Sequence, residues 1–314
     1  MADIPNTDIR SGFDLYWLKT LLPALEAKEK LRQKYLSRFW FVLLLALFIV
    51  PMVIIGCYVL SRHFNKNLDP SLIFLFVAVV TFILQRPYHY YKKQIKQDIM
   101  PLFAGYFDGF QYQYGQGLRE DELQDSRIFP SFDTFEADDC FKGIYQGVPI
   151  RVMEERLKVY HRTKHGRREV TVFKGVAVEL DLQKMFTSHT IVLKDSGIFN
   201  RLKRFSGLER IRLEDPKFEK IFEVYGSDQI EARRQLTPVF MERILKLKNL
   251  YGGKSIQFSF YEGKLLIAIK TNQDMFEPFS FFKTNINKPK IDTVFEQFLT
   301  IFEIINILKI AGKA

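Results

Sequence analysis

The stretch from Phe39 to Leu60, FWFVLLLALFIVPMVIIGCYVL, decides the architecture of this chain. It contains 22 residues and no charged side chain. As a helix rising about 1.5 Å per residue, it would cover the roughly 30 Å hydrocarbon layer of a bilayer. Pro51 lies inside the run, where a membrane helix tolerates a proline with a kink. The run begins too late and is too long for a cleaved signal peptide, so we predict a transmembrane span at 39–60.

A second apolar run, from Ser71 to Gln85, follows a short polar gap. Its strictly apolar part is short enough for a re-entrant or buried helix as well as for a span. A full crossing is favoured by Asp69-Pro70, which suit the N-cap and the first helical position, and by an aromatic belt of Tyr88 and its neighbours. The sequence therefore predicts a transmembrane hairpin with a second span at 71–85.

Basic residues flank the hairpin and are sparse in its connecting loop, which has only Arg62 and Lys66. Cytoplasmic ends of membrane spans carry an excess of Lys and Arg, so both chain ends are expected in the cytoplasm. The flanking basic residues are Lys28, Lys30, Arg32, Lys34, Arg38, Arg86, Lys92, Lys93 and Lys96.

Composition predicts a packed domain after the hairpin. Hydrophobic residues make up 47% of the sequence, and 31 residues are phenylalanine. The net charge of +10 is compatible with nucleic-acid binding, but membrane-proximal basic residues explain it more simply, since each gains about 1 kcal/mol near anionic lipid. A nucleic-acid partner is therefore disfavoured. Cys57 and Cys140 provide no disulfide framework, which fits a reducing cytoplasm.

The predicted fold class is α+β: an N-terminal two-helix transmembrane hairpin followed by a cytoplasmic domain of mixed sheet and helix. We divide the chain into a cytoplasmic amphipathic helix at 1–38, the hairpin at 39–87, a juxtamembrane helix (91–103) and connector at 88–127, and the α+β domain at 128–314.

Within the α+β domain, alternating patterns and turn residues predict strands, and helix caps predict helices. A third span at 291–310 is disfavoured, because Glu296 and Glu303 would be costly in lipid. The predicted strands are 141–145, 148–160, 169–181, 191–194, 218–225, 255–261 and 264–270, and the predicted helices follow Asp228 and Thr237 and occupy 291–310.

Several motifs along the chain occur in a recognisable order. They are the stretch from Phe141 through Phe173-Lys174-Gly175, Leu213 to Glu219, Tyr225 to Arg233, Leu236-Thr237-Pro238, and Met275 to Pro278. These motifs resemble a bacterial domain-of-unknown-function family, family 3137. The resemblance implies a two-span protein of the bacterial cytoplasmic (inner) membrane with a cytoplasmic α+β domain, and it implies no known activity. It also implies a LemA-type membrane protein as a candidate partner, because members of the family often lie near such proteins.

Two groups of residues are candidate binding sites. The first is Ser227, Asp228, Arg233 and Arg234, where a helix N-terminus with cations farther along could hold an anionic ligand or an acidic partner segment; a simple capped helix would explain the same residues. The second is a basic loop that could contact anionic lipid, or could be a solvated hairpin tip: Arg162, Lys164, Arg167 and Arg168.

We assign no catalytic, cofactor-binding or metal-binding residue. His161 and His165 have a helical metal spacing but lie in a predicted turn among cations. The acidic groups Glu120-Asp121-Glu122, Asp138-Asp139 and Glu154-Glu155 are interpreted as solvated surface.

The sequence thus favours a membrane-tethered protein-binding or scaffolding module. The alternative is a membrane-anchored regulatory domain that senses an anionic ligand or lipid headgroup, and an enzyme of unknown reaction is a weaker one. Transport is disfavoured, because neither span carries a charged residue that could line a pathway.

Overall fold

The computed structural model describes residues 6–64, 70–163, 166–182, 188–195, 207–250 and 255–308. They fall into two compact units. The helical unit contains residues 4–103 and 278–290, and the sheet unit contains 104–277 and the residues from 291 onward. The described chain therefore passes between the units after residues 103, 277 and 290.

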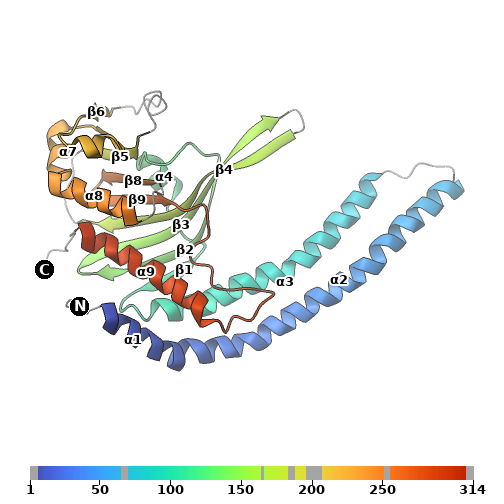
Figure 1. Ribbon diagram of the computed structural model, residues 1–314. Coiled ribbons are helices and arrows are strands. Elements are labelled where there is room, and N and C mark those ends of the chain that lie inside the picture. Colours follow the sequence, from blue (N-terminus) through green and yellow to red (C-terminus); the bar gives the residue numbers. More distant parts are fainter. Residues whose placement is uncertain are drawn as a thin grey trace. The chain divides into compact units, whose positions relative to one another are not determined.

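The helical unit contains two long helices. α1 (Asn6–Tyr16) and a π-helical turn, η1 (Trp17–Leu21), lead into α2 (Leu22–Phe64), and α3 (Pro70–Ala104) returns alongside α2 (Figure 1). The first apolar run lies within α2 and the second within α3, as the sequence predicts. The helix expected at 91–103 is not a separate element, because α3 continues into it through Pro87.

Side-chain contacts define how α2 and α3 align. Lys28 Nζ lies 2.6 Å from Asp98 Oδ2, and the ring centroids of Tyr35 and Tyr91 lie 6.2 Å apart. Because both helices rise by the same amount per residue, this antiparallel register places the start of the first apolar run level with the end of the second. The two runs lie side by side, which favours a full crossing by the second.

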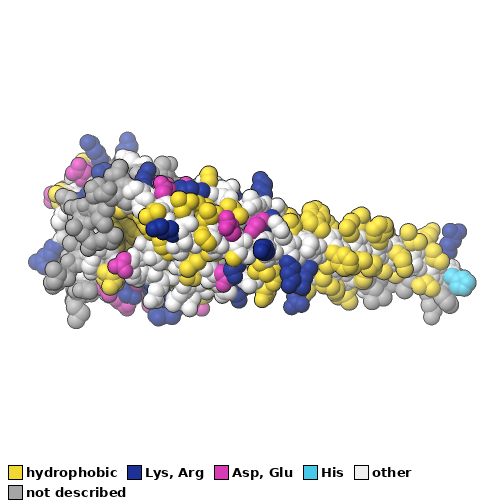
Figure 2. Space-filling view, turned by 90° about the horizontal axis from the view of Figure 1, so that it is seen from below, with side chains coloured by type: hydrophobic (Ala, Val, Ile, Leu, Met, Phe, Trp, Pro, Cys, Tyr) yellow, Lys and Arg dark blue, Asp and Glu magenta, His cyan; other side chains and the backbone are white. Residues whose placement is uncertain are grey.

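By length and composition, both helices could cross a membrane. Their apolar stretches are not buried inside the protein, and Phe48, for example, is 72% exposed. Figure 2 shows hydrophobic side chains covering the long helices on the face in view, with Lys and Arg side chains gathered where this surface begins. Exposed apolar surface of this extent is typical of membrane or protein contacts. The helices therefore indicate membrane association.

The sheet unit is built on a single sheet, and the predicted α+β class is confirmed. The described strands follow the order β1-β2-β3-β4-β9-β8-β5-β7-β6, and all neighbouring pairs are antiparallel. The strands are β1 (Gln111–Tyr114), β2 (Thr134–Tyr145), β3 (Val148–Thr163), β4 (Gly166–Asp181), β5 (Thr190–Lys194), β6 (Glu209–Ile211), β7 (Phe222–Gly226), β8 (Ile256–Tyr261) and β9 (Lys264–Lys270). The helices of this part of the chain are α4 (Glu120–Asp125), α6 (Pro216–Glu219), α7 (Gln229–Gln235), α8 (Pro238–Leu250) and α9 (Lys288–Leu308).

Local signals set several of these elements. Glu262 and Gly263 join β8 to β9 and have φ angles of 48° and 76°, the left-handed conformation that a two-residue type I′ turn requires. Thr237 Oγ1 accepts a hydrogen bond from Phe240 N at 3.3 Å, which caps α8 as predicted.

The predicted strand at 218–225 is wrong in its first part. Asp215 Oδ1 accepts hydrogen bonds from Lys217 N at 2.8 Å and from Phe218 N at 3.2 Å, and Pro216 follows at the first helical position. This capped turn forms α6 and buries Phe218, so the strand β7 begins only at Phe222.

Helices cover one face of the sheet. Phe240 of α8 and Phe260 of β8 have ring centroids 5.9 Å apart, and Phe298 of α9 lies 4.5 Å from Phe141 of β2 (Figure 1). The prediction that the last helix packs on the sheet is therefore confirmed. The opposite face is covered by the segment around α4, where Leu118 and neighbouring apolar side chains join the core formed by the strands.

Candidate functional site

β3 and β4 extend beyond the rest of the sheet (Figure 1). β2 pairs with β3 only as far as Lys158, and β9 pairs with β4 only from Gly175 onward. Farther out, β3 and β4 pair with each other, and we call residues 159–163 and 166–170 the basic ribbon. No strand in the described parts of the chain pairs with its outer edges. The basic ribbon therefore presents backbone and side-chain groups to solvent.

The basic ribbon brings together three of the four residues predicted to contact lipid. Arg162 lies directly opposite Arg167, and Arg168 is the next residue along β4. The guanidinium carbon of Arg167 lies 3.8 Å from the centre of the Tyr160 ring, a cation–π contact. The fourth predicted residue, Lys164, lies outside the described residues, as does His165.

Cations of β3 and β4 closer to the sheet form ion pairs, whereas the ribbon arginines form none with the described carboxylates. Lys158 Nζ lies 2.7 Å from Glu136 and 2.9 Å from Glu169, and Lys174 Nζ lies 2.8 Å from Asp274. Within the described ranges, no carboxylate forms an ion pair with the three ribbon arginines. Like charges directly opposite each other destabilise a strand pair. The ribbon therefore holds positive charge that the fold leaves unbalanced.

In the second predicted site, Ser227 and Asp228 form hydrogen bonds with neighbouring backbone groups. Ser227 Oγ accepts a hydrogen bond from His189 N at 2.9 Å. Asp228 Oδ1 accepts from Ile230 N at 2.7 Å and caps α7. Arg233 and Arg234 lie in the last turn of this seven-residue helix. These contacts support the capped-helix explanation over a ligand site.

A charged network between α4 and the sheet was not predicted. Arg151 Nη2 donates hydrogen bonds to Glu122 Oε1 and Glu179 Oε2, each at 2.7 Å. The interpretation of the acidic groups as solvated surface is wrong for Glu122, and also for Asp139 and Glu154, because all three are buried. Glu122 Oε2 accepts a hydrogen bond from Arg119 N at 2.9 Å, so the helix cap turns this carboxylate toward the sheet.

Glu155 lies beside this network and is also buried, contrary to expectation. Its Oε1 accepts a hydrogen bond from Leu118 N at 2.7 Å. Burial raises the pKa of Glu155 to about 8, against the opposing effect of that hydrogen bond and of Arg151. The side chain is therefore largely protonated at neutral pH, which explains how a carboxyl group is accommodated in the core.

His189 joins the α4 segment to the sheet. Its Nε2 lies 2.9 Å from Ser259 Oγ and 3.3 Å from Ser126 O, and its ring stacks on Tyr261 with centroids 5.5 Å apart. Burial lowers the pKa of His189 to about 4, so the imidazole is neutral at pH 7. A histidine bonded to a serine resembles a nucleophile with its base, but Ser259 is fully buried, which favours a structural role.

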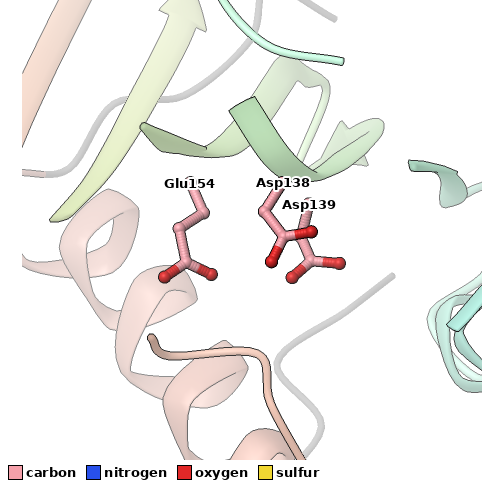
Figure 3. A group of neighbouring side chains, drawn as sticks. All are labelled: Asp138, Asp139 and Glu154. Atoms are coloured by element: carbon pink, nitrogen blue, oxygen red, sulfur yellow. The ribbon is translucent and has the colours of Figure 1, made fainter. Parts of the chain in front are cut away.

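Three carboxylates gather where β2 bulges against β3. Asp138, Asp139 and Glu154 each offer an oxygen within 4.8 Å of the others, and Figure 3 shows their side chains projecting in the same direction. Asp139 Oδ1 accepts from Tyr112 OH at 2.5 Å, and Glu154 Oε1 accepts from Met275 N at 3.1 Å. Carboxylate oxygens are ligands that Mg²⁺ and Ca²⁺ prefer, but these contacts also give the group a role in the fold.

Comparison with known proteins gives a family match and no activity. A search of curated proteins finds no match. Among solved structures, the chain is similar to the crystal structure of the mycobacterial trehalose monomycolate transport factor A, TtfA, with 12% identity, coverage of 65% of this chain and 91% of that one, and a TM-score of 0.34. This TM-score is too low to support an argument about function.

The family match covers less than half of the chain, within its C-terminal part. Residues 171–310 match the model of a family described as protein of unknown function (DUF3137). The motifs from Phe173 to Pro278 lie inside this region, whereas the stretch beginning at Phe141 starts before it. The resemblance to family 3137 is therefore confirmed over residues 171–310.

Proposed function

We propose that this protein is a membrane-tethered binding module of the bacterial inner membrane. In this proposal α2 and α3 cross the bilayer, both chain ends face the cytoplasm, and the basic ribbon holds an acidic segment of a protein partner. The excess of Lys and Arg on either side of the hairpin supports the orientation.

The unbalanced charge of the basic ribbon carries the proposal. Arg162 and Arg167 oppose each other across the strand pair, an arrangement of like charges that destabilises the pair. Salt bridges neutralise Lys158 and Lys174 of the same two strands. An acidic partner would supply the missing negative charge and form charge-assisted hydrogen bonds with the guanidinium groups.

The shape of the ribbon favours a protein segment as this partner. Asp133 Oδ2 accepts a hydrogen bond from Tyr160 N at 2.6 Å, and beyond this point no described strand pairs with the outer edges of the ribbon. An extended acidic peptide can pair with the exposed backbone groups there as an added strand. Such pairing would add backbone hydrogen bonds to the attraction between charges. The module would then act as a scaffold that brings the partner to the membrane.

A second candidate function uses the same arginines to sense anionic lipid headgroups. The clustering of Arg162, Arg167 and Arg168 at a ribbon end favours it, because each such residue near an anionic surface gains about 1 kcal/mol. Lipid binding would require charge only, whereas protein binding would also involve the ribbon edges.

Site-specific crosslinking in native membranes tests the proposal. A photo-crosslinking residue at Thr163 in the full chain should form a protein adduct. The double variant Arg162→Glu, Arg167→Glu should lose it. The variant Arg233→Glu, Arg234→Glu makes the same change in charge at the other predicted site and should keep it. A LemA-type membrane protein is the first candidate to seek in the adduct.

A lipid measurement separates the two candidates. The full chain in phosphatidylcholine nanodiscs is mixed with vesicles rich in phosphatidylserine, and co-flotation is measured for the same variants. Loss of co-flotation in the ribbon variant, without any protein adduct at Thr163, would establish lipid sensing instead. If the full chain forms no adduct and shows no co-flotation, both functions are contradicted. Loss of the adduct only in the Arg233, Arg234 variant would assign the contact to α7.

A further inference from the structure

Residues 278–290, which follow β9 and include the first residues of α9, belong to the helical unit although they are distant from it in sequence. Asn285 holds this segment in one conformation. Its Oδ1 accepts from Ser280 N at 2.6 Å, and its Nδ2 donates to Ser280 O at 3.0 Å and to Tyr91 OH at 2.6 Å. The two bonds to Ser280 close the loop, and the bond to Tyr91 attaches it to α3. Asn285 itself is buried.

The same loop is attached to α2. Arg32 Nη1 donates a hydrogen bond to Phe281 O at 3.0 Å. The guanidinium group is oriented by Glu29, whose Oε1 lies 2.6 Å from Arg32 Nη2 and 2.9 Å from Nε. The hydrogen bond from Arg32 lowers the pKa of Glu29, so this pair remains ionised. Arg32 therefore positions the loop as well as contributing to the basic flank.

The loop lies at the level where the first apolar run begins and the second ends. The Phe281 ring contacts the rings of Phe39, Tyr88 and Tyr91, with centroids 5.7 to 5.8 Å apart. Phe39 is the first residue of the first apolar run, and Tyr88 follows the second run. A membrane crossed by these runs would have one of its interfaces at this level.

Phe281 is 4% exposed, whereas Phe282 is 55% exposed. The Phe282 ring rests on Phe39 at 5.5 Å between centroids, and Lys283 follows it with an exposed side chain. A phenylalanine left in water loses the free energy that its burial in apolar surroundings would provide. An aromatic ring beside a cation, at the end of an apolar span, matches the composition of a bilayer interface.

We infer that Phe282 inserts into the bilayer interface as a third membrane contact, supplied by a loop remote in sequence from the hairpin. This inference rests on the proposed crossing of the bilayer by α2 and α3. The loop is held by Arg32 and Tyr91, so Phe282 reaches the interface without first having to become ordered.

Depth-dependent quenching tests the inference on the full chain. Single cysteines at position 282 and at two control positions are introduced in a Cys57→Ser, Cys140→Ser background, labelled with an environment-sensitive fluorophore and reconstituted in nanodiscs. The discs contain lipids that are spin-labelled near the headgroup or deep in the acyl chain. Phe48, in the middle of the first apolar run, is the membrane control. Leu15 in α1 is 53% exposed and matches Phe282 in exposure outside the runs.

The label at position 282 should show blue-shifted emission and stronger quenching by the shallow spin label than by the deep one. The label at 48 should be quenched most by the deep spin label, and the label at 15 by neither. Quenching at 48 without quenching at 282 would overturn the inference and leave the membrane crossing intact. A blue shift at 282 without quenching would assign Phe282 to a protein contact. Absence of quenching at both 48 and 282 would overturn the crossing itself.

Discussion

The β3–β4 strand pair carries arginines toward both of its ends, Arg151 of β3 at one and Arg162 of β3 with Arg167 of β4 at the other, and the two ends differ in whether these charges are paired. Toward the sheet, Arg151 is paired with two buried carboxylates at 2.7 Å. In the basic ribbon, Arg162 and Arg167 face each other in solvent, with no carboxylate among the described residues to pair with them. The comparison separates charges that hold the fold from charges that remain available to a partner.

The largest expected effect is at the buried end. Arg151→Ala would leave Glu122 and Glu179 buried without their main counter-charge, and breaking a buried ion pair in this way costs about 3–5 kcal/mol. We expect faster hydrogen exchange of the β3 and β4 amides, measured on the full chain in nanodiscs.

Arg151→Lys is the matched control for this change. Because it keeps the positive charge, it should lose less stability than the alanine variant. It should still lose some stability relative to the unchanged protein, because lysine lacks the planar guanidinium group that donates to both carboxylates. Unchanged exchange in Arg151→Ala would show that the buried network does not hold the fold and would remove the contrast with the ribbon.

A smaller effect on stability is expected from Glu155, and its pH dependence tests the buried end of the strand pair separately from the ribbon. Its pKa is about 8 in the folded protein against an ordinary value of 4.5, so the folded state binds more protons between these values. Stability should therefore fall as pH rises through this window, by about 2 kcal/mol between pH 6 and pH 8. Glu155→Gln should remove most of this fall in hydrogen-exchange stability. A fall of equal size in the variant would assign the pH dependence to another group.

The smallest effect is expected in the basic ribbon. Arg162→Ala removes one of two opposed cations, so stability should change by less than about 0.5 kcal/mol. Arg162→Glu creates an opposite-charge pair with Arg167 and should stabilise the ribbon by about 0.2–1 kcal/mol, measured by exchange of the ribbon amides. A destabilisation above about 1 kcal/mol would mean that these arginines serve the fold after all.

Local chemistry made part of the fold predictable. The apolar runs in α2 and α3, the Asp228 cap of α7 and the Glu262-Gly263 turn are each encoded within a few residues. The basic ribbon belongs to this class, because Arg162, Arg167 and Arg168 lie close together in the sequence. The sequence could not predict that these arginines lack a carboxylate partner among the described residues, because this depends on where carboxylates such as Asp274 lie in space.

The rest depends on contacts between distant residues. β5 lies between β7 and β8, and no local pattern specifies that order. Arg151 meets Glu122 and Glu179 from other elements, so acidic residues that looked solvated are buried. The loop that carries Phe282 was equally hidden, because its sequence gives no sign that it packs on α2.

The three passages of the chain between the two units have a mechanical consequence. A domain on a single linker separates from its anchor after one proteolytic cut. Here, a nick between Ala104 and Gln111 would leave the sheet unit continuous with residues 278–290, which are bonded to Arg32 and Tyr91. The sheet unit of the nicked protein would therefore stay attached to the long helices. In the intact chain, a force applied to the sheet unit would be transmitted to the helices through three chain connections rather than one.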